Sequence, residues 1–352
     1  MKILSVVGAR PQFVKLAPIV KASSKFPISH ATVHTGQHYD EAMSKVFFEE
    51  LGIGKPEWNL GVGSGSHGEQ TAEMLKRLEE LFLKEQPNWI LIYGDTNSTL
   101  AAALAATKLH LPLAHLEAGL RSFNRMMPEE HNRVLSDHAS DLLLAPTDKA
   151  AKQLAKEGLE DRTVTVGDVM IDILLDVASS QENTLPQIVA ESVEGSEYIL
   201  ATIHRAENTD NSQRLSEVIS VLAALPLPVV FPVHPRVKDK VKGTDIDLNQ
   251  GSLLPVEPLS YRQMIATVQR ARSVITDSGG LQKEAAVLGV PVTTLRTETE
   301  WTETLDDERN VLAPDLKGVE ELVMRSISQV SNWAPYGKGK ASEKVLETLT
   351  SR

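Results

Sequence analysis

Short apolar runs alternate along this chain with polar turns and with segments whose apolar residues recur at helical spacing. Runs that are apolar on both faces are typical of strands buried within a parallel sheet. The alternation of such strands with helices predicts an α/β fold with parallel sheets. The expected strands are residues 3–7, 89–93, 113–116, 142–144, 198–203, 229–233, 252–256, 273–276 and 292–295.

The helices carry recognisable start signals. Ser66 and Glu69 have the spacing of a capping box, in which each side chain satisfies a backbone N–H of the other residue. Apolar residues then follow at helical spacing between 74 and 82. A further helix is expected from about Pro128, and a last one over residues 340–350.

A chain of 352 residues is too long for one ordinary domain. The strand–helix rhythm is lost over residues 179–196, which are rich in Ser, Glu and Pro and are interpreted as a linker region. We therefore expect two Rossmann-like lobes, residues 1–172 and 173–337. The helix near 338–352 could pack back on the first lobe.

Composition excludes several classes of protein. The net charge of −11 argues against a nucleic-acid partner, which would need a basic face. The absence of cysteine excludes disulfides, thiolate metal sites and a cysteine nucleophile, and no histidine spacing suggests a metal site. The sequence lacks an apolar run of about 18 residues, so no membrane span is expected. The first apolar run is too short for a signal peptide, and a cytoplasmic location is expected.

Polar residues gather where the expected strands end. Ligands of open parallel sheets bind at the carboxyl ends of the strands, so two lobes that present such edges to each other would form one deep polar cleft. The polar segments at these ends are residues 8–10, 94–96, 115–117, 204–205 and 277–280.

Two of these segments favour an anionic ligand. Ser278, Gly279 and Gly280 close a strand and open a helix, where close backbone approach and free N–H groups suit a diphosphate. An ordinary strand-to-helix turn is the alternative. Arg10 and Lys15 follow the first strand and would face the cleft as cations, unless both are solvated surface charges. The first turn lacks the G-x-G-x-x-G pattern, so NAD is not expected, and neither is any other cofactor.

Candidate acid–base groups lie at the same edges. Asp95, Glu117 and Glu129 follow strands of the first lobe, and His204 ends the first strand of the second. Each could instead be a salt-bridge partner or a structural group, and Asp95 could be the N-cap of the next helix. Glu130 lies beside Glu129, so the sequence leaves open which of the two faces inward.

Together these segments resemble the non-hydrolysing UDP-N-acetylglucosamine 2-epimerase family. The match runs in order along nearly the whole chain. The matching segments are residues 7–12, 35–38, 93–98, 115–121, 127–133, 166–168, 204–208, 276–282 and 336–342.

The resemblance implies a glycosyltransferase-B-like fold, a homodimer, and UDP held mainly by the C-terminal lobe. It implies inversion of C2 of a UDP-2-acetamido sugar without NAD. A base removes the C2 proton while UDP leaves C1, and a 2-acetamidoglucal forms beside UDP. The proton then returns to the other face and UDP adds back.

By the same resemblance, Asp95, Glu117 and Glu129 would be the acid–base carboxylates, and His204 would lie at the diphosphate and C1. The remaining implied contacts are Arg10 and Lys15 with phosphate or sugar, Ser278, Gly279 and Gly280 with the phosphates, Glu284 with the ribose hydroxyls, and Met264 against uracil.

The expected reaction interconverts UDP-N-acetylglucosamine and UDP-N-acetylmannosamine. Many family members have Thr-Glu-Arg-Pro-Glu where this chain has residues 299–303 with Trp301. That segment, together with residues 204–208, also looks like enzymes acting on UDP-2,3-diacetamido-2,3-dideoxy-glucuronic acid, the alternative substrate. A glycosyltransferase, a hydrolysing epimerase and a catalytically silent nucleotide-sugar binding protein are further alternatives.

Overall fold

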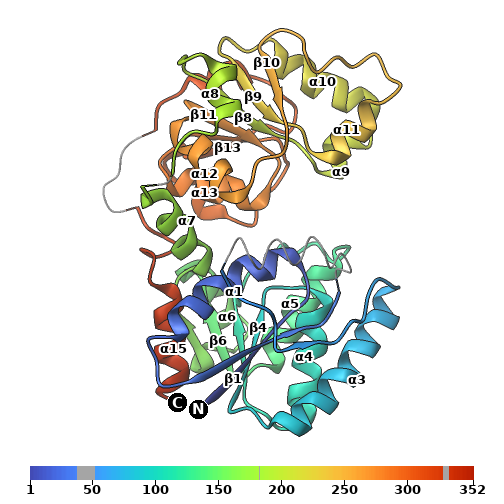
Figure 1. Ribbon diagram of the computed structural model, residues 1–352, viewed down its shortest axis with the longest axis vertical. Helices are drawn as coiled ribbons and strands as arrows, with labels where there is room; N and C mark the ends of the chain where they lie inside the picture. Colours follow the sequence, from blue (N-terminus) through green and yellow to red (C-terminus); the bar gives the residue numbers. More distant parts are fainter. Residues whose placement is uncertain (38–51, 182, 328–332) are drawn as a thin grey trace. The chain divides into compact units, whose positions relative to one another are not determined.

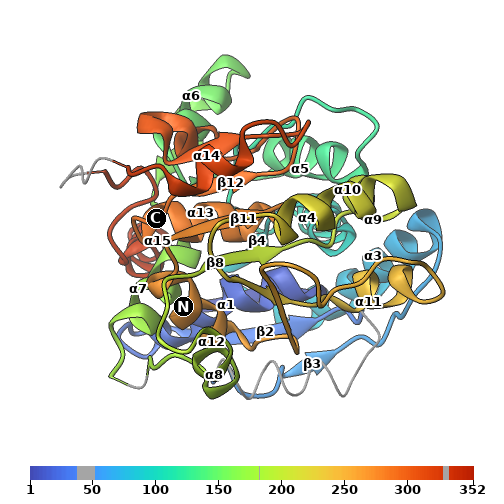
Figure 2. The same cartoon turned by 90° about the horizontal axis from the view of Figure 1, so that it is seen from above.

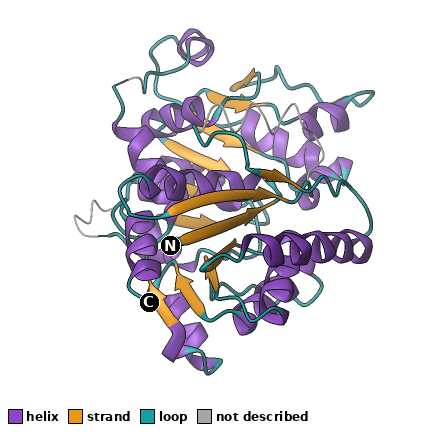
Figure 3. Cartoon of the chain, turned by 60° about the horizontal axis from the view of Figure 1, so that its bottom comes forward, coloured by secondary structure: helices purple, strands orange, loops and turns teal. Residues whose placement is uncertain are grey.

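The computed structural model describes residues 1–37, 52–181, 183–327 and 333–352. These residues form two compact units, Met1–Leu175 with Ala334–Arg352 (unit 1) and Asp176–Trp333 (unit 2) (Figure 1). The predicted fold class is confirmed, because each unit contains one sheet in which every strand pair is parallel and helices flank the strands (Figure 3). Whether the lobes divide at residues 172 and 338, as expected from the sequence, stays a prediction.

The sheet of unit 1 has seven strands in the order β3-β2-β1-β4-β5-β6-β7. The chain reverses its direction of winding beside β1, which is where parallel sheets open a crevice at their carboxyl edge. The strands are β1 (Lys2–Val7), β2 (Ser29–His34), β3 (Trp58–Asn59), β4 (Trp89–Tyr93), β5 (Leu113–Leu116), β6 (Leu142–Ala145) and β7 (Thr163–Thr165).

Helices cover this sheet. The capping box at the start of α3 (His67–Glu85) is confirmed. Ser66 is the N-cap and its hydroxyl accepts from the N–H of Glu69, while the carboxylate of Glu69 accepts from the N–H of Ser66. Met74, Leu78 and Phe82 are buried on one face of that helix. The other helices of unit 1 are α1 (Arg10–Ser23), α4 (Asn97–Lys108), α5 (Pro128–Ala139), α6 (Asp148–Lys156), η1 (Glu160–Arg162), α7 (Val169–Ser179), which runs on into unit 2, and α15 (Ala341–Thr350).

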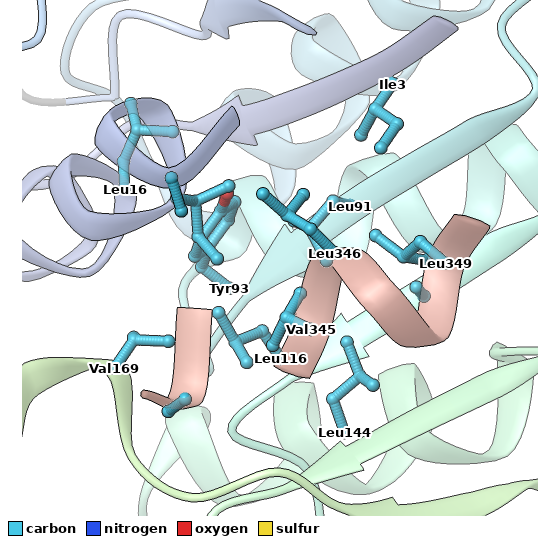
Figure 4. Close-up of a cluster of buried hydrophobic side chains, with 14 of the residues drawn as sticks. Ile3, Leu16, Leu91, Tyr93, Leu116, Leu144, Val169, Val345, Leu346 and Leu349 are labelled. Atoms are coloured by element: carbon cyan, nitrogen blue, oxygen red, sulfur yellow. The ribbon is translucent and has the colours of Figure 1, made fainter. Parts of the chain in front are cut away.

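The last helix completes the core of unit 1. Val345, Leu346 and Leu349 of α15 are fully buried and point toward the strands (Figure 4). The start of α15 is held by Asp172 of α7, whose carboxylate accepts hydrogen bonds from the N–H groups of Ala341 (2.9 Å) and Ser342 (2.7 Å).

The sheet of unit 2 has six strands in the order β10-β9-β8-β11-β12-β13. Its core consists of Val, Ile and Leu side chains on both faces of β8, β9 and β11. The strands are β8 (Ile199–Thr202), β9 (Val229–Pro232), β10 (Leu253–Val256), β11 (Ser273–Thr276), β12 (Val292–Thr294) and β13 (Asn310–Leu312).

One expectation about unit 2 is wrong. Part of the segment interpreted as a linker, residues 179–196, forms the helix α8 (Gln187–Val193). Val189 and Val193 are spaced four residues apart on this helix, and both side chains are buried against the sheet of unit 2. Helix α9 contacts both α10 and α11, and these three helices lie on the same side of unit 2 (Figures 1 and 2). The other helices are α9 (Ala206–Thr209), α10 (Ser212–Ala223), α11 (Pro235–Val241), α12 (Tyr261–Arg270), α13 (Gly279–Val287), η2 (Thr302–Glu308) and α14 (Val319–Met324).

No helix among the described residues is long and apolar enough to span a membrane.

Candidate active site

The carboxyl ends of β4 and β5 bring two candidate carboxylates together. Tyr93 pairs with Leu116 at the end of the ladder, so the next residues, Gly94 and Glu117, continue side by side. The N–H of Gly94 donates to the carbonyl of Leu116 (3.0 Å). Asp95 follows directly, and therefore both Asp95 and Glu117 lie at the edge where parallel sheets bind ligands.

Lys15 of α1 forms an ion pair with Glu117, and only 16% of the lysine side chain and 10% of the glutamate side chain are exposed. Burial lowers the pKa of Lys15, but the charges of Glu117 and Asp95 outweigh burial and leave this pKa above its ordinary value. Lys15 therefore stays cationic. Gly94 makes room for the pair, because a side-chain carbon at this position would lie 3.1 Å from Nζ of Lys15.

Arg133 of α5 is the cation that pairs with Asp95. Its other guanidinium nitrogen lies 3.0 Å from Oε2 of Glu130. Burial lowers the pKa of Arg133, but Asp95, Glu130 and Glu117 together outweigh burial and leave this pKa above its ordinary value. The sequence patterns do not assign Arg133 a role, although its spacing of three residues from Glu130 on an expected helix is a usable signal.

Glu129 and Glu130 differ sharply. Glu130 is buried and accepts hydrogen bonds from the N–H groups of Ser122 and Phe123, both at 2.9 Å. Burial raises the pKa of Glu130, but these donors and Arg133 lower it below its ordinary value. Glu129 is exposed in the first turn of α5 and has no hydrogen bond or ion pair with another described residue.

The alternative role of Asp95 as a helix cap is wrong. The N-cap of α4 is Thr96, whose hydroxyl accepts from the N–H of Thr99. The carboxylate of Asp95 remains with Arg133, and a third of its side chain is exposed.

Glu117 lies in a turn with unusual backbone geometry. Its φ of +71° is in the left-handed region, which a residue with a side chain occupies at a cost of about 1–2 kcal/mol. Gly119 has a φ of +86°, and a side-chain carbon there would lie 2.5 Å from the carbonyl oxygen of Ala150. Glycine at 119 thus allows the turn to pack against α6, and strain of this kind is found at functional sites.

In unit 2, the start of α13 offers free donors. Ser278 is the N-cap and its hydroxyl accepts from the N–H of Leu281 (3.4 Å). The N–H groups of Gly279 and Gly280 have no acceptor among the described residues. With the positive end of the helix dipole, these donors suit an anion.

Two charged side chains border this helix start. A side-chain carbon on Gly279 would clash with Oε1 of Glu300 and would lie 3.8 Å from Nη2 of Arg205. Glu300 is paired with Arg296 at 2.9 Å through its other oxygen. The guanidinium of Arg205 has no hydrogen bond or ion pair within the described part of the chain.

His204 is oriented by Asp277, a residue of the 276–282 segment to which the sequence alone assigns no role. Nδ1 of His204 lies 3.0 Å from Oδ1 of Asp277, which is fully buried at the end of β11. Burial raises the pKa of Asp277, but His204 and the N–H groups of His204 and Arg205 lower it more. Asp277 therefore stays ionised and leaves Nε2 of His204 available to a ligand.

Glu284 and Met264 come from neighbouring helices of unit 2. Glu284 is buried in α13, and the hydroxyl of Tyr261 donates to its Oε1 (3.0 Å). Met264, one turn after Tyr261 in α12, is half-buried against the core. Tyr261 is thus a further residue of this group that is not predicted from the sequence.

The predicted site residues therefore fall into two groups, one in each unit. Lys15, Asp95 and Glu117 form one electrostatic cluster with Arg133 in unit 1, and Glu129 has no hydrogen bond or ion pair with any of these described residues. The second group, in unit 2, consists of Met264, His204, Ser278, Gly279, Gly280 and Glu284. Arg10 begins α1, but its side chain lies outside the described residues, as does His38 of the segment 35–38. No cluster of three or more His, Asp or Glu suited to a metal is found within the described ranges.

Two Rossmann-like sheets, paired carboxylates at one sheet edge and a helix start suited to phosphate define an enzyme of the nucleotide-sugar class. Comparison with known proteins gives the family. The family model described as UDP-N-acetylglucosamine 2-epimerase matches residues 21–350, and the chain belongs to this family of isomerases.

Relatives match over the full length. The chain is similar to the UDP-N-acetylglucosamine 2-epimerase homolog of Methanococcus maripaludis (46% identity, 99% of each chain covered). It is also similar to the UDP-2,3-diacetamido-2,3-dideoxy-D-glucuronate 2-epimerase of Pseudomonas aeruginosa (45% identity, 99% of each chain covered). Its fold matches the solved structure of Methanocaldococcus jannaschii UDP-GlcNAc 2-epimerase in complex with UDP-GlcNAc and UDP (TM-score 0.85, 39% identity, 100% of each chain covered). The family and the fold class expected from the sequence are thereby confirmed.

Proposed function

We propose that this chain inverts C2 of a UDP-2-acetamido sugar, interconverting UDP-N-acetylglucosamine and UDP-N-acetylmannosamine. The observation that carries this proposal is the cluster at the ends of β4 and β5, where two carboxylates each hold a buried cation, in a chain that matches the epimerase family from residue 21 to residue 350.

The reaction needs a base for the C2 proton and a stabilised leaving group at C1. A carboxylate takes the C2 proton, the C2–H electron pair forms the C1–C2 double bond, and the C1–O bond electrons leave with UDP. A second side chain, in its carboxylic acid form, then gives its proton to the opposite face of C2 of the resulting 2-acetamidoglucal, and UDP adds back to C1. Asp95, Glu117 and Glu129 are the candidates for these proton transfers.

The groups of unit 2 suit the departing UDP. The free N–H groups of Gly279 and Gly280 and the exposed side of His204 can stabilise negative charge on the diphosphate. Glu284 is an acceptor for ribose hydroxyls, and Met264 presents an apolar surface for uracil. In unit 1, Lys15 and Arg133 balance the carboxylates, so an anionic substrate meets less repulsion there.

Proton NMR of the protein with UDP-N-acetylglucosamine in D₂O tests the proposal. The expected result is the manno isomer, with deuterium at C2 of both sugars and no free sugar. Free N-acetylmannosamine with UDP would indicate a hydrolysing epimerase instead. Turnover only after addition of an acceptor would indicate a glycosyltransferase, and unchanged substrate would indicate a binding protein.

A second substrate, UDP-2,3-diacetamido-2,3-dideoxy-glucuronic acid, is supported by Arg205 and by the 45% identical relative named for it. The guanidinium of Arg205 has no anionic partner in the described ranges, so it is available to a uronate carboxylate near the phosphate-binding turn. Exchange at C2 of this sugar, without exchange in UDP-N-acetylglucosamine, would make it the substrate.

The cytoplasmic location and the homodimer expected from the sequence belong to the same proposal. Sedimentation of the purified protein at micromolar concentration tests the homodimer.

A further inference from the structure

Strand β5 contains a histidine that the proposed reaction does not use. His115 is fully buried, and its Nε2 lies 2.7 Å from the carbonyl oxygen of Gly94. Its Nδ1 lies 2.7 Å from Oδ1 of Asp137, which is also fully buried.

Both neighbours of the ring are acceptors. A backbone carbonyl cannot donate, and Asp137 is ionised, because its pKa is raised by burial but lowered more by His115 and Arg121. Both hydrogen bonds form only if each ring nitrogen of His115 carries a proton. His115 thus joins the carbonyl of Gly94 to the carboxylate of Asp137 through its two ring nitrogens.

Asp137 connects His115 to a second turn of the backbone. Its Oδ2 accepts from the N–H of Gly119 (3.1 Å) and pairs with Nη1 of Arg121 (2.7 Å). Arg121 also forms an ion pair with Glu157, in which Nη2 of Arg121 lies 2.7 Å from Oε2 of Glu157. The carboxylate of Asp137 thus has a partner for each oxygen and no exposure to water.

The two backbone groups held by this network flank the candidate carboxylates. Gly94 immediately precedes Asp95, and Gly119 follows two residues after Glu117, the residue held at a φ of +71°. The strained turn needs surrounding bonds to persist, and the N–H of Gly119 supplies one of them.

We propose that His115 and Asp137 are positioning residues that clamp the Gly94–Asp95 turn to the 117–119 turn and so fix Asp95 relative to Glu117. The inference rests on the proposed epimerase function. Its alternative is a buried ion network that stabilises unit 1 without setting the geometry of the site.

Three variants separate these possibilities. His115→Phe fills a similar volume without donors, and Asp137→Ala removes both acceptors. Asp137→Asn keeps an oxygen for the N–H of Gly119 and offers an amide N–H to Nδ1, so a neutral His115 can still donate to Gly94. The control is Asp141→Ala, which removes the acceptor of the Leu113 N–H (2.9 Å) at the opposite end of β5.

The measurement is the rate of C2 deuterium exchange together with the dissociation constant of UDP. For H115F and D137A we expect the exchange rate to fall by about 10²-fold or more, because displacing reacting groups by about 1 Å has this effect. UDP should bind within about threefold of wild type, since its proposed contacts lie in unit 2. D137N should recover most of the rate, and D141A should match wild type. Rates near wild type in H115F, equal loss of UDP binding, or a D137N as inactive as D137A would each overturn the clamp.

D137A leaves the buried side chains of Arg121 and His115 without the carboxylate of Asp137 and could fail to fold. In that case H115F and D137N decide the result. A crystal structure of H115F gives a readout that does not depend on activity: the expected change is departure of Glu117 from its left-handed conformation. An unchanged turn would overturn the clamp even if wild type showed no exchange, an outcome that would separately contradict the proposed function.

Discussion

At the scale of single residues, the site is organised by pairing each candidate carboxylate with its own cation. Lys15 serves Glu117 and Arg133 serves Asp95, and both cations are largely buried. Such ion pairs orient the carboxylates, and no group of three or more His, Asp or Glu suited to a metal ion is found in the described ranges.

Substitution of the acid–base candidates tests this arrangement. Asp95→Asn, Glu117→Gln and Glu129→Gln should each lower turnover by about 10²–10⁴-fold, the usual contribution of a placed acid or base. The readout is C2 deuterium exchange at saturating substrate. Near wild-type rates in all three variants would contradict the proposed mechanism.

Substitutions of the neighbouring residues Glu129 and Glu130 should affect stability differently. Glu130→Ala removes a buried acceptor of two N–H groups and should lower the free energy of unfolding by about 1–3 kcal/mol. Glu129→Gln should leave stability within about 0.5 kcal/mol, because Glu129 is exposed. Urea denaturation measures both, and equal destabilisation by the two substitutions would contradict the structural distinction.

Glu300 places a negative charge beside the proposed phosphate-binding turn. Glu300→Gln should therefore tighten UDP binding by about tenfold, equivalent to about 1.4 kcal/mol. Calorimetric titration measures this, with Glu298→Gln as a control of equal charge change on an exposed residue. Weaker binding by E300Q would mean that the carboxylate accepts a hydrogen bond from the ligand.

At the scale of elements, most buried strands could be predicted because they are apolar on both faces. The structure adds β2, β3, β7 and β13, whose sequences are short or polar. In β2, the polar residues His30 and Thr32 obscure the apolar pattern, although His30 finds a partner inside unit 1 in the hydroxyl of Ser5.

Whether a site residue could be predicted from the sequence depends on its position relative to the strands and helices. Asp95, Glu117, His204 and the turn before α13 could be found because they directly follow strands. Arg133, Tyr261 and Asp137 lie within helices, and their partners are fixed only by how helices pack on the sheet.

His30 makes the stability of β2 depend on pH. Its Nε2 lies 2.8 Å from the hydroxyl of Ser5 in β1, and burial lowers its pKa to about 4 while Glu57 raises it slightly. The unfolded chain takes up a proton near pH 6.5, before the folded protein does. The contribution of His30 to the free energy of unfolding is therefore fully present above pH 6.5. It is lost as the pH falls toward 4, and the loss amounts to about 3 kcal/mol in total.

His30→Gln should flatten this part of the stability profile, measured by urea unfolding between pH 4 and 7. The exposed His110 provides a control, His110→Asn, which should keep the wild-type slope. An unchanged slope in H30Q would assign the acid sensitivity to other groups.

Helix α15 should contribute strongly to unit 1. Leu346 is fully buried, so Leu346→Ala should cost about 2–5 kcal/mol of unfolding free energy. Leu83→Ala on α3 is the matched control, because that leucine is 55% exposed. A loss below 1 kcal/mol in L346A would show that unit 1 is stable without the packing of this helix.

At the scale of the whole molecule, the proposed division of labour assigns UDP to unit 2 and proton transfer to unit 1. UDP at about 100 times its dissociation constant should stabilise its binding unit by about 2.7 kcal/mol. Hydrogen exchange should then slow in α12 and α13. Protection confined to unit 1 would contradict this division.

Helix α15 also determines the order in which the two units can be completed during translation. Its apolar residues join a core whose other members precede residue 170, whereas unit 2 is continuous from Asp176 to Trp333. On the ribosome, the sheet of unit 1 emerges with part of its apolar surface uncovered, and the whole of unit 2 is synthesised before α15 can cover it. The second unit in the sequence is thus the first that can finish folding, and the nascent first unit depends on residues that are synthesised after the whole of unit 2.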